Sequence, residues 1–111
     1  MERREGRVEF LGEQIGSAED GLKRALILEF VTRPVIRRAY LAQVGFQPSI
    51  ERAVALCIVS EQPDDRSLII RIGEIFRSLF GKDAFMDVLF LTAEQEVDVA
   101  RVCSSFYARA T

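Results

Sequence analysis

Histidine is absent from the 111 residues of this sequence, and no other absence restricts its chemistry as much. Histidine is the commonest general base near neutral pH and the commonest metal ligand in proteins. Without it, the chain cannot form Ser–His or Cys–His nucleophile pairs of its own or supply a zinc site that uses imidazole. We therefore expect a protein that is not an enzyme and that has no catalytic residue, metal site or cofactor.

Cysteine is nearly absent too, since the chain has only Cys57 and Cys103. The two lie far apart, do not form a CxxC motif and cannot supply a four-cysteine zinc site. Because disulfides are rare in the cytosol, we expect two buried, reduced thiols in a cytoplasmic protein. No signal peptide is recognisable, and no apolar run approaches the ~20 residues that span a membrane, so we expect no membrane partner.

An excess of positive charge is also missing. The net charge is −2 and the pI is near 5.2, whereas nucleic-acid binders usually carry a basic field that attracts phosphates. Strand candidate 52–60 carries no aromatic residue on which a base could stack, which argues against an RNA-recognition domain. We expect no nucleic-acid partner.

The residues that are present favour one globular domain. Apolar residues make up 49% of the chain and charged residues 29%, which is typical of folded proteins and not of disordered ones. The length suits a single hydrophobic core. We expect residues 1–111 to form one domain, with residues 1–6 as a native start or a frayed terminus.

Three stretches repeat apolar residues every three or four positions and predict helices over residues 19–33, 68–80 and 94–106. Pro34 should end the first helix, because the residue before a proline avoids the helical region. The expected caps are a Ser17–Asp20 capping box, the acidic pair Asp64 and Asp65, Gly81 and Thr92.

Four further stretches predict strands over residues 7–11, 35–46, 52–60 and 85–91. The second and third are close enough in sequence to form an antiparallel hairpin across a connection that contains Pro48. The order βαββαβ plus a C-terminal helix predicts the α+β class. We expect a four-stranded antiparallel sheet of the ferredoxin-like (split βαβ) type with two helices on one face.

The strand candidates 52–60 and 85–91 are apolar on both sides, whereas a sheet with one solvated face should alternate apolar and polar residues. Two helices can cover one face, so the second face needs another cover. The C-terminal helix is the nearest candidate and a second copy of the chain is the next. We therefore expect a homo-oligomer or a protein partner.

Gly12 and Gly16 lie between a predicted strand and a predicted helix, where backbone amides can cradle an anion. The spacing is not that of a dinucleotide-binding or P-loop motif, and Glu19 and Asp20 follow and would repel phosphate. An ordinary loop is the alternative.

Arg33, Arg37 and Arg38, with Lys23 and Arg24, form a local concentration of positive charge. The three arginines are candidates for binding a carboxylate, a phosphate or an acidic patch on a partner. The alternative is a solvated helix end and strand start, because cations suit the C-terminus of a helix.

Several stretches together resemble the C-terminal domain of the enhanced serine sensitivity protein family, SseB. They are FLGE at Phe10–Glu13, LKRALILEFVTRPVIRRAYLAQV at Leu22–Val44, IGEIF at Ile72–Phe76, MDVLFLT at Met86–Thr92 and SFYAR at Ser105–Arg109. The resemblance implies a bacterial, cytoplasmic protein of a family that is named after a phenotype and has no established catalytic residues. Members often carry this domain after a separate N-terminal domain.

These observations favour a non-enzymatic interaction or regulatory module that self-associates. The alternative is a domain that senses a small metabolite, such as an amino acid, bound near the Gly12–Gly16 loop or between protomers. The alternative rests on analogy with other domains of the same element order.

Overall fold

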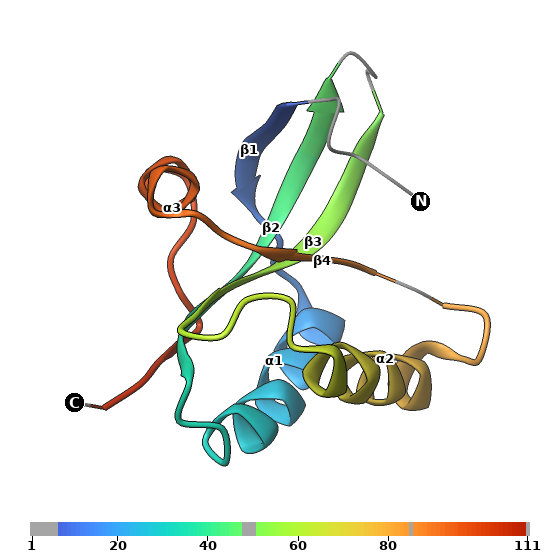
Figure 1. The fold of residues 1–111 in the computed structure, drawn as a ribbon. Helices are drawn as coiled ribbons and strands as arrows, with labels where there is room; N and C mark the ends of the chain where they lie inside the picture. Colours follow the sequence, from blue (N-terminus) through green and yellow to red (C-terminus); the bar gives the residue numbers. More distant parts are fainter. Residues whose placement is uncertain (1–6, 48–50, 85, 111) are drawn as a thin grey trace.

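The computed structural model describes residues 7–47, 51–84 and 86–110. Its elements, shown in Figure 1, are β1 (Arg7–Glu13), α1 (Ser17–Phe30), β2 (Ile36–Gln47), β3 (Arg52–Ser60), α2 (Arg66–Phe80), β4 (Asp87–Phe90), α3 (Ala93–Ala100) and β5 (Tyr107–Ala108). This order confirms the predicted α+β class and the βαββαβ arrangement followed by a helix. The predicted terminus 1–6, the Pro48 connection and Phe85 lie outside the described residues.

The sheet is mixed, which corrects the prediction of an antiparallel split βαβ sheet. Its strand order is β1-β2-β3-β4, with β5 beside β2. The pairs β1–β2 and β2–β3 are antiparallel, as the hairpin prediction required, but β3–β4 is parallel. In a split βαβ sheet the first strand lies inside the sheet, whereas β1 here pairs only with β2 among the described strands.

The two connecting helices explain the difference. At the end of β1, the Gln14 amide donates to the Leu41 carbonyl at 3.0 Å, and α1 then continues in the direction of β1 towards Ile36, where β2 begins. The chain therefore returns antiparallel in β2. After β3, α2 carries the chain back, so that Asp87 pairs beside Ala55 and β4 runs parallel to β3. Element order alone does not distinguish these two kinds of connection.

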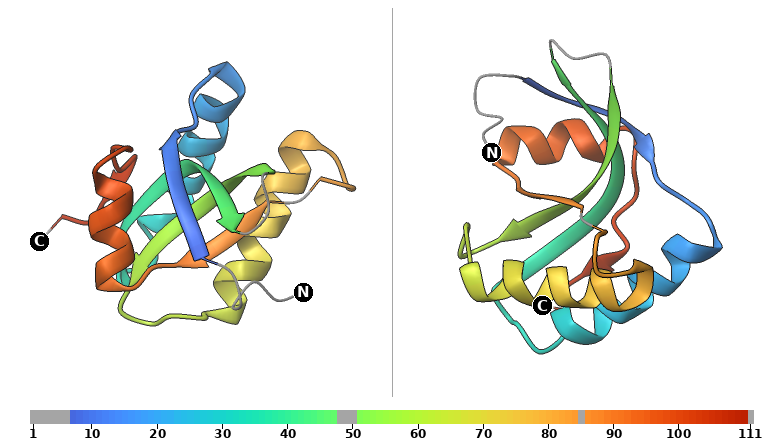
Figure 2. Two further views of the ribbon diagram at one scale, coloured as in Figure 1. Left: turned by 90° about the horizontal axis from the view of Figure 1, so that it is seen from above. Right: turned by 90° about the vertical axis from the view of Figure 1, so that its right-hand side faces the viewer.

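Each face of the sheet has its own core. Ala39 and Leu41 of β2 face α1 and α2, while Tyr40, Ala42 and Val44 face the opposite side. Figure 2 shows α3 on the side of the sheet opposite to α1 and α2. The C-terminal helix therefore covers part of the second face, which confirms the first of the two predicted covers.

The helix caps agree with the sequence at two helices and differ at the third. Asp65 accepts a hydrogen bond from the Leu68 amide at 3.2 Å, and Thr92 forms a complete capping box with Gln95. The predicted Ser17–Asp20 box at α1 is wrong. Gly16 occupies the cap position without a side-chain hydrogen bond, which places Ser17 inside the helix.

The helix α3 ends at Ala100, earlier than the predicted position 106. After it, the Phe106 amide donates to the Ala39 carbonyl at 2.9 Å, and β5 pairs antiparallel with β2. The chain must leave the helix to reach this edge of β2, and local periodicity does not encode that long-range pairing.

Candidate functional site

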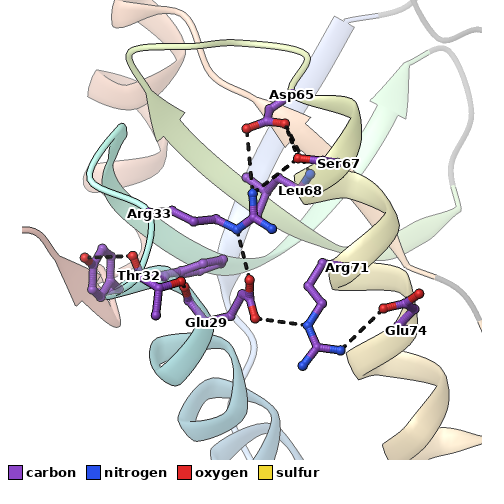
Figure 3. A network of polar contacts seen from close by, with 10 residues as sticks. Glu29, Thr32, Arg33, Asp65, Ser67, Leu68, Arg71 and Glu74 are labelled. Carbon is purple, nitrogen blue, oxygen red and sulfur yellow. Dashed lines mark hydrogen bonds and ion pairs between the residues drawn. The ribbon is translucent and has the colours of Figure 1, made fainter.

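An ionic network joins the end of α1 to the start of α2 (Figure 3). Glu29 accepts hydrogen bonds from Arg71 and Arg33, each with an N–O distance of 3.0 Å. Arg33 also lies 3.9 Å from an Asp65 carboxylate oxygen. The pKa of Glu29 is lowered, mainly by the hydrogen bond from Arg71 and also by the one from Arg33, although burial acts in the opposite direction. The network fixes these two helix ends against each other.

At the opposite end of the same two helices lies a hollow of about 370 Å³, which we call the α1–α2 groove. Its floor comes from β2 and β3, and its walls come from the start of α1, the end of α2 and the start of β4. Its lining residues are Glu19, Leu22, Leu41, Ala53, Val54, Phe76, Phe80, Met86 and Asp87.

The walls of the groove are apolar and partly open to solvent. The rings of Phe76 and Phe80 contact each other, with centroids 4.7 Å apart, and Phe80 keeps 42% of its surface exposed. Exposed apolar residues continue along α2 at Ile69, Ile70 and Leu79. A concave apolar surface beside exposed aromatic and aliphatic side chains is typical of a binding site.

The polar part of the groove is acidic. Gln14 donates to the Glu19 carboxylate at 2.8 Å, and this hydrogen bond is the main cause of the lowered pKa of Glu19. Glu19 also lies in the first turn of α1, where the helix dipole favours negative charge. Asp87 adds a second carboxylate. Among the described residues that line the groove, none is lysine or arginine.

The predicted Gly12–Gly16 loop reaches this groove through Glu19. Gly16 has a φ of +154°, and a Cβ there would lie 2.4 Å from a Glu19 carboxylate oxygen. Only glycine lets the carboxylate approach the backbone so closely. Gly12 lies within β1 and pairs with Gln43. The loop is thus already lined by the chain's own carboxylate.

The three predicted arginines do not come together. Arg33 belongs to the network between α1 and α2, whereas Arg38 pairs with Glu96 of α3 on the other side of the sheet. Arg37 is exposed at a register shift in the β2–β3 pairing, between Ile36 and Arg38. Its charge acts on Glu96 more weakly than the hydrogen bonds from Arg38 and Tyr40 do. Lys23, which the sequence placed in the same cluster, lies 3.2 Å from Glu13.

The contact between Arg38 and Glu96 fixes α3 to the sheet. The guanidinium donates twice to the carboxylate, through Nε and through Nη2, the latter at 3.0 Å, and the Tyr40 hydroxyl donates to the same carboxylate at 3.0 Å. Arg38 is the main cause of the lowered pKa of Glu96, and burial is the main cause of the raised pKa of Tyr40.

Cys57 and Cys103 are both buried and free, as predicted. Burial raises the pKa of Cys57 to about 12 and that of Cys103 to about 11, so neither thiol is activated as a nucleophile. The residues that the structure describes contain no group of three or more metal-ligating side chains that could hold an ion. They also contain no helix long and apolar enough to cross a membrane.

Sequence reasoning missed the groove, although a signal for it exists in α2. Leu68, Ile72 and Ile75 of this helix are buried and complete a core-facing stripe. Phe76 packs against the same core, but Phe80, one turn later, is 42% exposed. The apolar surface of the helix therefore continues beyond the part that the core buries.

The comparisons with known proteins identify the family. No curated protein and no solved structure matches the chain. The family described as SseB protein C-terminal domain matches residues 14–109, which is nearly the whole sequence and includes the groove and both ionic contacts. The resemblance inferred from the sequence is thereby confirmed, and the chain belongs to the SseB protein C-terminal domain family.

Proposed function

We propose that this domain is a non-enzymatic interaction module of a bacterial cytoplasmic process and that it binds its partner through the α1–α2 groove. The observation that carries the proposal is the groove itself, a hollow of about 370 Å³ with mainly apolar walls and a partly exposed aromatic pair. Burying such a surface against a partner is favourable, because it removes apolar area from water.

The chemistry of the groove supports binding and not catalysis. Its titratable lining residues, Glu19 and Asp87, are both acids. The described lining contains no hydroxyl or thiol nucleophile beside a base, which a nucleophilic mechanism would require.

Affinity capture with a matched control tests the proposal. Phe80→Ser changes the groove wall, while Leu28→Ser changes an α1 residue that is 73% exposed and does not line the groove. We expect bacterial proteins retained by the wild type and by Leu28→Ser to be lost with Phe80→Ser, whose thermal unfolding confirms that it is folded. An identical set of retained proteins for all three would contradict the proposal.

Self-association stays a prediction, and we assign it to exposed apolar residues of α2 outside the groove. The sequence-based reason for it was an uncovered second sheet face, but α3 covers part of that face. Ile69, Ile70 and Leu79 are exposed on α2, on the opposite side of the sheet from α3 (Figure 2), and do not line the groove. Light scattering over a range of concentrations should show a dimer that Ile70→Ser weakens, and a monomer at all concentrations would rule it out.

A metabolite-sensing domain is the second candidate. The groove volume falls near the lower end of small-molecule sites, about 300–1,000 Å³, and Glu19 connects the groove to the Gly16 end of the predicted loop. A ligand that binds the folded state raises the unfolding temperature. One compound from an amino-acid panel should therefore shift the transition in the wild type and less in Phe80→Ser, whereas a flat panel would count against this candidate.

A further inference from the structure

We propose that the occupant of the α1–α2 groove is a segment of a partner protein in which an apolar side chain is followed by a lysine or arginine, with the apolar side chain between Phe76 and Leu22 and the cation at Glu19. This inference rests on the proposed function and specifies the chemistry of the partner. It follows from the separation of the groove into an apolar interior and an acidic rim.

The interior selects an apolar side chain of limited size. Leu22 is almost fully buried, and Phe76 and Met86 are partly buried, so a side chain that enters the groove meets only apolar atoms from these three residues. A volume of about 370 Å³ is small for an intact helix, and it suits one or two side chains projecting from an extended or irregular segment.

The rim selects a positive charge. The Glu19 carboxylate is held in place by a hydrogen bond from the Gln14 amide, which is uncharged and leaves the negative charge on the carboxylate. Lys23 forms its ion pair with Glu13 at 3.2 Å, and its charge affects the pKa of Glu19 less than the Gln14 hydrogen bond does. A partner cation would therefore meet a carboxylate that is already positioned, which reduces the ordering that binding requires.

The same rim discriminates against other segments. An acidic side chain next to the apolar anchor would meet the Glu19 carboxylate, and like charges at an interface are repelled. A neutral segment would bury the apolar side chain but would gain nothing from the rim. The expected order of affinity is basic, then neutral, then acidic.

Three short peptides, acetylated and amidated, test this order directly. They are identical except for the residue after a central phenylalanine, which is lysine, glutamine or glutamate. Each is titrated into the isotope-labelled full chain, and the amide shifts of Leu22, Val54 and Phe76 report on three sides of the groove. We expect the lysine peptide to bind tightest, with a preference over the glutamate peptide of about five-fold, as for a solvent-accessible charge pair.

Matched variants assign the preference to one carboxylate. Glu19→Gln should reduce the ratio of the lysine-peptide affinity to the glutamate-peptide affinity towards one. Asp20→Asn removes an exposed carboxylate from the same helical turn but outside the groove. This variant should keep most of the preference for the lysine peptide. If Glu19→Gln perturbs the helix start, the same preference can be followed in the wild type with increasing salt, which should screen it.

The outcomes separate the inference from the proposed function. Equal binding of all three peptides at the groove would overturn the charge preference and leave the interaction module intact. Failure of all three to shift the groove amides would overturn both. Shifts of the same amides on simple concentration of the protein would show a second copy in the groove and would overturn the assignment to a partner segment.

Discussion

The Arg38–Glu96 contact makes a measurable contribution to stability, because it is the polar link between α3 and the sheet. The side chains of Arg38 and Glu96 are 35% and 19% exposed, so solvent screens the pair only in part. Exposed ion pairs contribute about 0.2–1 kcal/mol, and charge-assisted hydrogen bonds that are partly desolvated contribute about 1.5–3 kcal/mol. We expect Glu96→Gln to lower the free energy of unfolding by about 1–2 kcal/mol, since glutamine retains one acceptor.

A double-mutant cycle isolates the interaction from side effects of each substitution. We would combine Glu96→Gln with Arg38→Met and follow urea unfolding by circular dichroism, expecting a coupling energy of about 1 kcal/mol. For a domain of this size, the single variants should lower Tm by roughly 5–10 °C.

The exposed pair between Arg101 and Asp98, 3.8 Å apart with side chains 73% and 60% exposed, is the control, and its cycle should give no measurable coupling. A coupling energy at Arg38–Glu96 as small as that of the control would refute the reasoning from burial and hydrogen bonding.

Three further predictions concern the loop, the carboxylates and the thiols. Gly16→Ala should lower the free energy of unfolding, measured in urea, by about 1–3 kcal/mol, because Gly16 has a φ of +154° and a carboxylate beside it. Gly12→Ala, with no atom within 4 Å of the added Cβ, should lower it less, and equal losses would contradict this reasoning. The pKa of Glu96 is lowered in the folded protein, so its contribution to stability is present above the ordinary carboxyl pKa and is lost as pH falls through the folded value. The free energy of unfolding of the wild type should therefore fall as the solution is acidified, and it should fall less in Glu96→Gln. Cys57 and Cys103 have pKa values raised to about 12 and about 11, so they contribute stability below the ordinary thiol pKa that is lost as pH rises towards those values; an aromatic disulfide reagent at about pH 8 should label neither in the native protein and both in denaturant.

The sequence predicted those parts of the fold that local patterns determine. The span of β3 matched its prediction because residues 53–59 form one uninterrupted apolar run between Arg52 and Ser60. The caps at Asp65 and Thr92 follow from short side chains next to the first helical turn. The parallel pairing of β4 with β3 was not predictable in this way. It depends on the direction in which α2 leaves the end of β3, which helical periodicity does not specify.

The candidate site shows the same division. The sequence located Gly16 and the acidic residue Glu19 behind it, and it located the apolar face of α2 that contains Phe76. Their meeting at one groove depends on how α1 and α2 are joined at their other ends through Glu29 and Arg71. The arginine cluster failed to form for a similar reason, since Arg33 pairs with Glu29 beside α2, whereas Arg38 pairs with a residue of α3 on the other side of the sheet.

The pairing of β2 has a consequence for how the protein avoids aggregation. One edge of β2 pairs with β3, and the other edge is shared by strands from opposite ends of the chain, β1 along Ala42–Gln47 and β5 at Arg38 and Ala39. The Arg109 amide extends this cover by donating to the Arg37 carbonyl at 2.8 Å. An unpaired strand edge is a template for intermolecular pairing. By pairing with the start of β2, residues 107–109 keep this part of the longest strand from pairing with another molecule.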